Sequence, residues 1–280
     1  DSGALDTVAR YNPPSGGYTP DFDYAGVAGE PCPRGFDFMA APWIPDLGKF
    51  VHVTGNVHNF GTNVYPWKDV SFDARAKIGG YDPATHKWND LGFRPSPNVG
   101  EGFTGAWNSR LKKAVWATAN AVFLMDLSTK VVTFQGISLP TSHSVEFGRD
   151  WYDADSDELY FAQIHTGRVW AYSFAKKTVR KVGSDLVPAA LGAGGENRAM
   201  VFFPKYKHLL IVYTEADTLG QPPWKLVNLT TGNTQHLRLY APGCSYHNAG
   251  AFHSASDTAV ITGGGGTNGA AFHHYKAALA

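Results

Sequence analysis

Four carboxylates and one phenol occupy the same position of a fivefold repeat, and they are the first candidates for chemistry in this sequence. Each lies twelve residues before the residue that opens the second strand of its repeat. Carboxylates brought together repel one another, so at least one takes up a proton unless a cation lies between them. Three outcomes stay open: a bound metal, a proton-sharing acid–base pair, or an exposed, solvated rim. The five residues are Asp37, Glu101, Glu146, Glu196 and Tyr246.

Cationic and amide side chains flank this position. Arg149 and Asp150 follow Glu146, and four more polar residues lie within two residues of the repeat position in the fourth and fifth repeats: Asn197, Arg198, His247 and Asn248. Oxygen donors such as Glu and Asn suit Ca²⁺. A carboxylate facing Arg or His equally suits general acid–base work on a bound sugar or lactone. His247 is alternatively an ordinary hydrogen-bonded loop residue.

The repeat that places these residues is a four-stranded antiparallel sheet, clearest over residues 144–182. β-branched and aromatic runs alternate there with short polar turns, the pattern of consecutive hairpins, and predict strands at 145–152, 158–163, 169–174 and 178–182. In all five repeats an aromatic residue stands six positions before the residue that opens the second strand. These pairs are Trp43 and Lys49, Trp107 and Lys113, Tyr152 and Glu158, Phe202 and His208, and Phe252 and Thr258.

Four-stranded repeats with a period of roughly 40 to 50 residues predict the blades of a β-propeller. We expect one all-β domain over residues 1–280, with five four-stranded blades at 35–91, 100–138, 144–185, 196–240 and 245–280. The last blade has room for only three strands. We therefore expect the N-terminal segment, residues 1–31, to supply the fourth strand and close the ring. If that segment begins a blade of its own, the count is six.

A long loop, residues 54–76, separates the second and third strands of the first blade. It belongs to the face on which the innermost strands begin, so it can cover the axial opening as a lid. The alternative is a surface embellishment. The candidate substrate-binding residues, from this loop and the strand starts, are Asp37, His58, Trp67, Arg149 and Tyr246.

Composition limits the partners and the compartment. The chain has 24 basic and 24 acidic residues and a net charge of zero, so it lacks the basic surface of a nucleic-acid-binding protein. No apolar run is long enough for a membrane-spanning helix. The first residue is Asp1 rather than Met, which fits a processed secretory protein, although an expression product would look the same. We expect an extracellular protein that binds a small molecule or glycan.

Cysteine placement and a glycosylation motif agree with secretion. Cys32 and Cys244 precede the innermost strands of the first and last blades, which a closed ring places side by side. A disulfide between them is therefore geometrically sensible, and two unrelated thiols are the alternative. Asn228-Leu229-Thr230 is an N-glycosylation sequon in a predicted hairpin turn.

Two stretches resemble known propeller families. Residues 78–88 (IGGYDPATHKW) resemble a kelch hairpin, and residues 146–182, with Leu159-Tyr160-Phe161 and Gly167-Arg168-Val169, are similar to blades of the gluconolactonase-like (SMP-30) propellers. The latter resemblance implies a divalent metal, typically calcium, held by Glu and Asn side chains at the tops of innermost strands. The residues that match by position are Glu146, Asn197 and Asn248. The chain departs from that family in lacking its Glu-Gly-Pro opening and in having five blades rather than six.

These observations favour a secreted enzyme of hydrolase or lyase type, acting on a glycan fragment or lactone in a carboxylate-lined axial pocket. Its expected catalytic residues are Glu101, Glu146, Glu196, Arg198 and His247. One alternative is a non-catalytic lectin that uses the surface aromatics Trp67 and Trp224. Another is a propeller that shapes a hydrophobic metabolite for cyclisation.

Overall fold

The protein is all-β in the residues that the computed structural model describes. These are residues 42–53, 78–85, 87–91, 105–117, 120–139, 149–162, 168–184, 198–213, 224–237, 246–253, 255–264 and 272–276. Their only helical elements are two 3-10 turns, η1 (Pro45–Leu47) and η5 (Pro204–Tyr206). Within these ranges no helix is long and apolar enough to cross a membrane.

The described strands form five antiparallel sheets, each built from strands consecutive in sequence. Sheet 1 contains β1 (Trp43–Ile44), β2 (Lys49–Val53), β3 (Ile78–Asp82) and β4 (Lys87–Asp90). Sheet 2 contains β5 (Ala106–Asn108), β6 (Lys113–Ala117), β7 (Ala121–Asp126) and β8 (Val131–Gly136). Sheet 3 contains β9 (Arg149–Asp153), β10 (Glu158–Ala162), β11 (Val169–Ser173) and β12 (Thr178–Val182). Sheet 4 contains β13 (Arg198–Phe203), β14 (His208–Tyr213), β15 (Trp224–Asn228) and β16 (Thr234–Leu237), and the three-stranded sheet 5 contains β17 (Tyr246–His253), β18 (Thr258–Gly264) and β19 (Phe272–Lys276).

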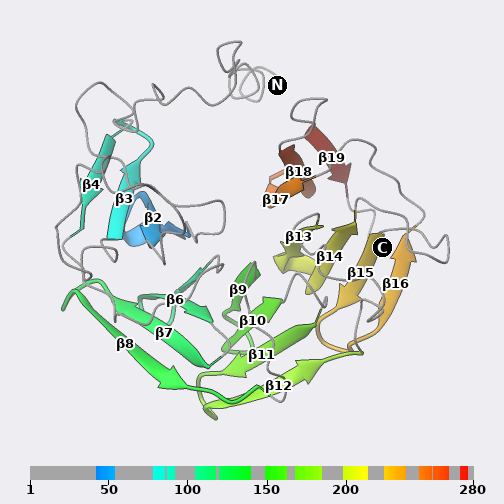
Figure 1. The fold of residues 1–280 in the computed structure, drawn as a ribbon, viewed down its shortest axis with the longest axis horizontal. Coiled ribbons are helices and arrows are strands. Elements are labelled where there is room, and N and C mark those ends of the chain that lie inside the picture. The colour runs from blue at the N-terminus through cyan, green and yellow to red at the C-terminus, as the bar shows by residue number, and fades with distance from the viewer. Residues whose placement is uncertain are drawn as a thin grey trace.

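The sheets follow one another around a common centre, as propeller blades do (Figure 1). The first strand of each sheet contacts the first strand of the next, in the order β1, β5, β9, β13, β17. The fourth strands, such as β8 and β12, lie on the outside of the arc. This arrangement supports a propeller-like fold. The described residues show no closed ring, so ring closure and the number of blades remain predictions.

The predicted repeat register is confirmed. Strands β2, β6, β10, β14 and β18 begin at the five residues expected to open the second strands. Each repeat aromatic pairs across the sheet with the residue after that opening, as in Tyr152 opposite Leu159 and Phe202 opposite Leu209. β12 spans the predicted residues 178–182, and β11 ends one residue earlier than predicted. Alternation of side chains along these strands was therefore a sufficient guide to the register.

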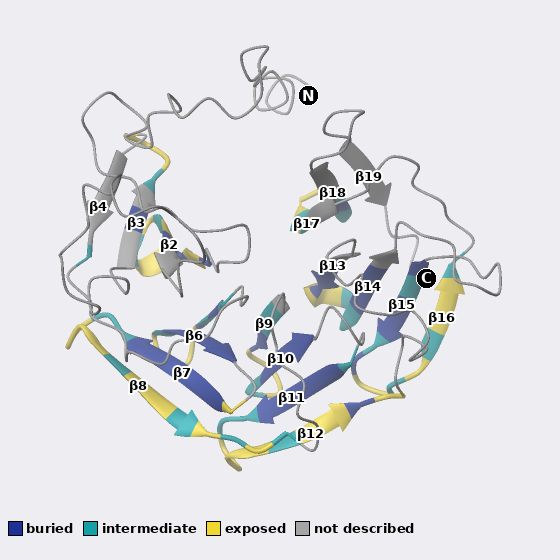
Figure 2. Ribbon diagram, viewed as in Figure 1, coloured by how far each residue is buried: buried dark blue, intermediate teal, exposed yellow. Residues whose placement is uncertain are grey.

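Buried residues lie along the inner and middle strands of the described sheets (Figure 2), and apolar side chains form clusters between neighbouring sheets. Because successive residues of a strand face opposite sides, each sheet contributes one face to the preceding sheet and one to the following sheet. Between sheets 1 and 2, for example, Ile44 and Val51 pack with Trp116, all fully buried, and Trp116 stacks on Phe123 at 5.4 Å. Full burial of such a side chain contributes about 1.5–3 kcal/mol. The outer strand β8 is mostly exposed.

Several predictions fall outside the described residues. They concern the N-terminal closing segment 1–31, the long loop 54–76, and both cysteines, Cys32 and Cys244. The closing strand, the lid and the disulfide therefore remain predictions. The domain boundaries likewise remain predictions.

Candidate functional site

The first strand of each sheet is followed by the same type of turn. The positions of these five turns show the direction in which the first strands run. The last residue of each turn has a left-handed backbone, with φ between 50° and 59°: Gly48, Lys112, Asp157, Lys207 and Asp257. Such a conformation is uncommon for residues other than glycine. We call this residue the left-handed position, and the residue two places before it the facing position. The five facing residues are Asp46, Arg110, Asp155, Lys205 and Ala255.

An ion-pair series connects these turns around the arc. In each case the facing residue of one sheet pairs with the left-handed residue of the next. The pairs are Asp46–Lys112 at 3.6 Å, Arg110–Asp157 at 3.5 Å, Asp155–Lys207 at 2.9 Å and Lys205–Asp257 at 2.8 Å. Exposed pairs of this kind contribute about 0–1 kcal/mol each. These pairs matter here for their geometry. Each one joins the turns at the ends of two neighbouring innermost strands, so the ends of all five innermost strands lie on one face of the molecule.

The innermost strands consequently begin on the opposite face, which we call the strand-start face. Three predicted site residues are the first residues of neighbouring innermost strands: Arg149 opens β9, Arg198 opens β13 and Tyr246 opens β17. The structure thus brings these three backbone positions to one face. The remaining predicted residues, apart from His247 and Asn248, lie outside the described ranges: Asp37, His58, Trp67, Glu101, Glu146, Glu196 and Asn197.

His247 and Asn248 lie in a β-bulge at the start of β17. Tyr246 pairs with Gly264 and Ala249 with Thr262, so β17 carries one more residue than β18 over this interval. Bulges bend a strand, redirect side chains and are frequent beside active sites. His247 is therefore a strand residue rather than a loop residue, and its role remains a prediction. This extra residue was not predicted from the repeat, and it shifts the pairing register between Tyr246 and Ala249.

Asp150 holds the strand starts of sheets 2 and 3 together. The backbone N–H of Gly105, directly before β5, donates a hydrogen bond of 2.7 Å to Oδ2 of Asp150. Gly105 has a φ of 69°, a conformation that glycine adopts without strain. The sequence placed Asp150 beside the repeat position without giving it a role. Its carboxylate acts on a neighbouring backbone and positions this part of the face.

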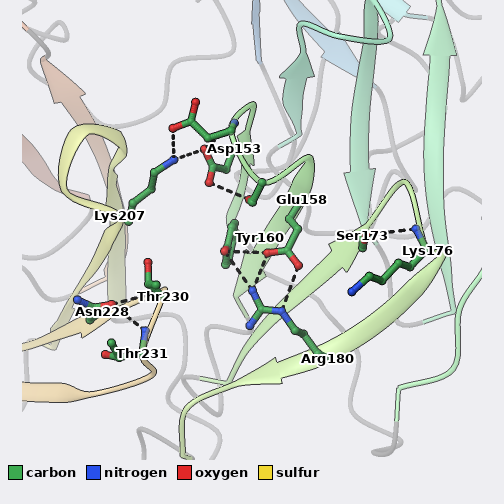
Figure 3. A network of polar contacts seen from close by, with 12 residues as sticks. Asp153, Glu158, Tyr160, Ser173, Lys176, Arg180, Lys207, Asn228, Thr230 and Thr231 are labelled. Atoms are coloured by element: carbon green, nitrogen blue, oxygen red, sulfur yellow. Dashed lines mark hydrogen bonds and ion pairs between the residues drawn. The ribbon is translucent and has the colours of Figure 1, made fainter.

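A buried carboxylate joins sheets 3 and 4 on the opposite face (Figure 3). The Lys207 ammonium contacts Asp153 and donates to Asp155, while the Ser156 hydroxyl donates to Asp153 at 2.8 Å. Burial raises the pKa of Asp153, but the hydrogen bonds from Lys207 and Ser156 outweigh it and hold the pKa below its usual value. Burial lowers the pKa of Lys207, and its two carboxylate partners more than compensate and raise it. Both groups are therefore charged at neutral pH.

Glu158, Tyr160 and Arg180 form a second polar group on sheet 3 (Figure 3). Arg180 donates to both carboxylate oxygens of Glu158, at 3.1 and 2.6 Å, and the Tyr160 hydroxyl donates at 2.9 Å. Burial raises the pKa of Glu158, but the bonds from Arg180 and Tyr160 lower it below its usual value. Burial and the neighbouring Glu158 raise the pKa of Tyr160. These shifts arise from satisfied ion pairing on strands, which indicates a structural role.

The described residues do not by themselves form a metal centre. They contain no group of three or more His, Cys, Asp or Glu side chains placed to hold an ion. Of the three predicted ligands, Asn248 lies in the β17 bulge, whereas Glu146 and Asn197 are outside the described ranges. Calcium binding therefore remains a prediction, and no chemical step is derived from it.

Trp224 is not a surface aromatic. It opens β15 with 4% of its surface exposed and packs with Val201, Phe203 and Leu210 between sheets 4 and 5. The expectation that it contacts a glycan from a lid loop is wrong. In the sequence, a core aromatic residue next to a polar loop looks the same as a glycan-binding aromatic residue. Only the packing of sheets 4 and 5 distinguishes the two.

The ion-pair series was missed at the sequence level, although its signal was present. When the repeats are aligned on their second strands, the facing and left-handed residues of sheets 2 to 4 have the same charge within one turn and the opposite charge in the next turn. Sheet 2 has Arg110 and Lys112, sheet 3 has Asp155 and Asp157, and sheet 4 has Lys205 and Lys207. Charge alternation read in register would have located the face where the innermost strands end.

Comparison with known proteins gives a likeness of fold. No family model matches the chain, and no curated protein matches it. A fungal alcohol oxidase of the AA5 family, solved in complex with copper, is 16% identical with a TM-score of 0.50, over 80% of this chain and 48% of that one. A structural genomics protein of unknown function from Bacteroides thetaiotaomicron is 9% identical with a TM-score of 0.52, over 79% and 55%.

These likenesses agree with the propeller-like arrangement of the sheets. The chain spans about half the length of the solved structures it matches. Neither structure supports membership of the gluconolactonase-like family, which remains a prediction.

Proposed function

We propose that this chain is a secreted, five-bladed propeller enzyme that binds a small polar substrate, a glycan fragment or lactone, at the strand-start face. The observation that carries the proposal is the convergence of three innermost strand starts on that face. Two of these strands open with arginines, Arg149 and Arg198, and the third carries His247 in a bulge. Residues 1–31 supply the fourth strand of the last blade in this proposal.

The predicted acids immediately precede these strands in sequence. Glu146 comes three residues before Arg149, and Glu196 two residues before Arg198. Carboxylates that approach one another beside arginines titrate differently: one stays ionised next to Arg and another takes a proton. In lactone hydrolysis, the ionised carboxylate takes a proton from the attacking water. The protonated carboxyl returns one to the ring oxygen as the acyl C–O bond breaks.

The experiment that tests this function is a turnover screen with lactones and short glycans on the purified chain. Glu146→Gln and Glu196→Gln are each expected to reduce kcat/KM by roughly 10²–10⁴-fold, the usual contribution of a general acid or base, with an unchanged urea midpoint. The matched control is Asp155→Asn on the opposite face, where the side chain is 86% exposed. If the two glutamine variants turn over like Asp155→Asn, the carboxylates are not catalytic and the proposal fails.

Metal assistance at this face has its own test. We expect Ca²⁺ to raise the thermal unfolding midpoint and EDTA to lower it, since an ion that binds only the folded state stabilises by about 2.7 kcal/mol at 100-fold above its Kd. Glu146→Gln should abolish the shift. Cu²⁺ belongs in the same titration, because one structural neighbour is a copper complex and imidazole and phenolate donors such as His247 and Tyr246 suit copper better than calcium. No shift with either ion would remove the metal and leave the acid–base pair.

The lectin alternative is weaker than it was from sequence. It named two aromatic side chains, of which Trp224 is buried between sheets. Trp67 lies outside the described residues, so its part in that alternative stays a prediction. No described residue favours the metabolite-cyclising alternative.

A further inference from the structure

Two arginines occupy the strand-start end of the interface between sheets 3 and 4. Arg149 opens β9 and Arg198 opens β13, and these two strands contact one another (Figure 1). Along β9, Arg149 has the register of Trp151, which packs in the apolar cluster between sheets 3 and 4. Along β13, Arg198 has the register of Phe202 in the same cluster, and the Trp151 and Phe202 rings lie 5.5 Å apart. The alternation of faces along a strand therefore assigns both arginines to one interface.

The repeat puts the two arginines at nearly the same level of this interface. Arg149 lies nine residues before Glu158, which opens β10. Arg198 lies ten residues before His208, which opens β14. The two levels thus differ by one residue of strand, which is about 3.3 Å. Neither position is basic in the first, second or fifth repeat, so folding of a sheet does not itself require a cation there.

The described carboxylates of sheets 3 and 4 are engaged elsewhere. Asp150 has the opposite register, toward sheet 2, and accepts the backbone N–H of Gly105 at 2.7 Å. The other four lie at the opposite end of the strands and pair with cations there: Asp153 and Asp155 with Lys207, Asp157 with Arg110, and Glu158 with Arg180. A guanidinium group stays charged at all ordinary pH values. Like charges therefore meet at the strand-start end of this interface unless an anion lies between them.

The proposed acid–base pair leaves one positive charge unbalanced here. In that mechanism one of Glu146 and Glu196 is ionised and the other holds a proton, whereas both arginines are charged. A negative group on the substrate completes the balance, and a planar guanidinium donates two parallel hydrogen bonds to a carboxylate, sulfate or phosphate. We propose that Arg149 and Arg198 form an oxyanion clamp and that the substrate is an acidic sugar held by its negative group. This inference rests on the proposed function and names the substrate class of the same site.

Paired acidic and neutral sugars test the clamp, because the members of a pair differ mainly in charge. The probes are galacturonate, galactose 6-sulfate and galactose 6-phosphate, with methyl galacturonate as the neutral match and inorganic phosphate as an oxyanion that needs no sugar contacts. Thermal midpoints of the purified chain are measured against each at equal ionic strength. We expect an acidic probe to raise the midpoint saturably while the methyl ester does not, since a ligand that binds only the folded state stabilises it. The acidic probe that binds most tightly identifies the oxyanion. If every acidic probe behaves like methyl galacturonate, the clamp is absent.

Substitution of either arginine separates a clamp from a structural cation. Arg149→Met and Arg198→Met should each weaken binding of the acidic probe roughly 10- to 100-fold, the usual effect of losing hydrogen bonds to a charged group. Binding of the neutral ester should not change, whereas damage to the fold would weaken both. Arg198→Lys should lie between, because lysine keeps the charge without the planar fork. It carries the comparison if the methionine variants do not fold. The matched control is Lys112→Met on the opposite face, 63% exposed, which removes the same charge and should leave the affinity unchanged.

Two further results would overturn the clamp. If both glutamates are ionised and already neutralise the arginines, the acidic probe binds Glu146→Gln and Glu196→Gln but not the wild type. If the arginines are only solvated, Arg149→Met binds the acidic probe as tightly as Lys112→Met does.

Failure of the clamp and failure of the proposed function give different results. Loss of turnover in Glu146→Gln, with equal kcat/KM for acidic and neutral substrates, overturns the clamp alone. Charge-selective binding that depends on both arginines, with unaffected turnover in Glu146→Gln, overturns only the proposed function.

Discussion

Gly183→Ala is expected to lower the free energy of unfolding by about 2–4 kcal/mol, because backbone touches backbone at this point. Gly183 follows β12 of sheet 3 with a φ of 69°. A Cβ there would lie 2.5 Å from the carbonyl oxygen of Gly232, in the turn between β15 and β16 of sheet 4. The left-handed backbone strains any L-residue, and a clash with a carbonyl cannot be relieved by a rotamer change.

Urea unfolding followed by tryptophan fluorescence measures this effect. Gly232→Ala should cost a similar amount, since its φ is 78° and its Cβ would lie 2.8 Å from the Cα of Gly183. The matched control is Gly136→Ala at the end of β8, where an added Cβ meets nothing within 4 Å, and we expect a change within about 0.5 kcal/mol. If Gly183→Ala unfolds at the same urea concentration as Gly136→Ala, the close approach of sheets 3 and 4 is absent in solution.

Lys207→Met is expected to cost about 2–3 kcal/mol at neutral pH, because it leaves the Asp153 carboxylate without its cation. The Asp153 side chain is only 7% exposed, so water cannot replace the ammonium, although Ser156 and the backbone N–H of Asp155 still donate to it. Lys207 also lies over the Trp151 ring at 5.7 Å, and the methionine retains most of that packing. The loss therefore reports mainly on the charge.

The pKa shift of Asp153 determines how the cost of Lys207→Met changes with pH. The pKa of Asp153 is lower in the folded state than the usual value of about 3.9. Its contribution to stability is therefore fully present above the unfolded pKa and is lost as the pH falls through the folded pKa. The cost of Lys207→Met should be full at pH 7 and shrink below about pH 4.

Urea unfolding of wild type and variant at pH 7 and at pH 3 measures the difference. Lys205→Met in the same turn is the control: Lys205 is 63% exposed and pairs with Asp257, so we expect a cost of at most about 1 kcal/mol. Equal costs for Lys207→Met and Lys205→Met, or a cost independent of pH, would contradict the assignment.

The strands and their register could be predicted from the sequence. A period-2 alternation of apolar residues, short polar turns, and an aromatic six residues before each second strand located five repeats, and the second strands begin where that register put them. These features are visible in sequence because a strand pairs with its neighbour along the chain, so the residues that specify a hairpin are close together. The repeat position of the carboxylates came from the same local register.

The residues of different sheets that contact one another could not be predicted from the sequence. The folded structure placed Trp224 in the core, made Asp150 a link to Gly105, and joined the turns in an ion-pair series. These outcomes depend on contacts between sheets, whose partners are about 50 residues apart in a repeat of this period. Packing between faces depends on shape and on backbone approach, as at Gly183 and Gly232, and a local pattern of residue types does not record either.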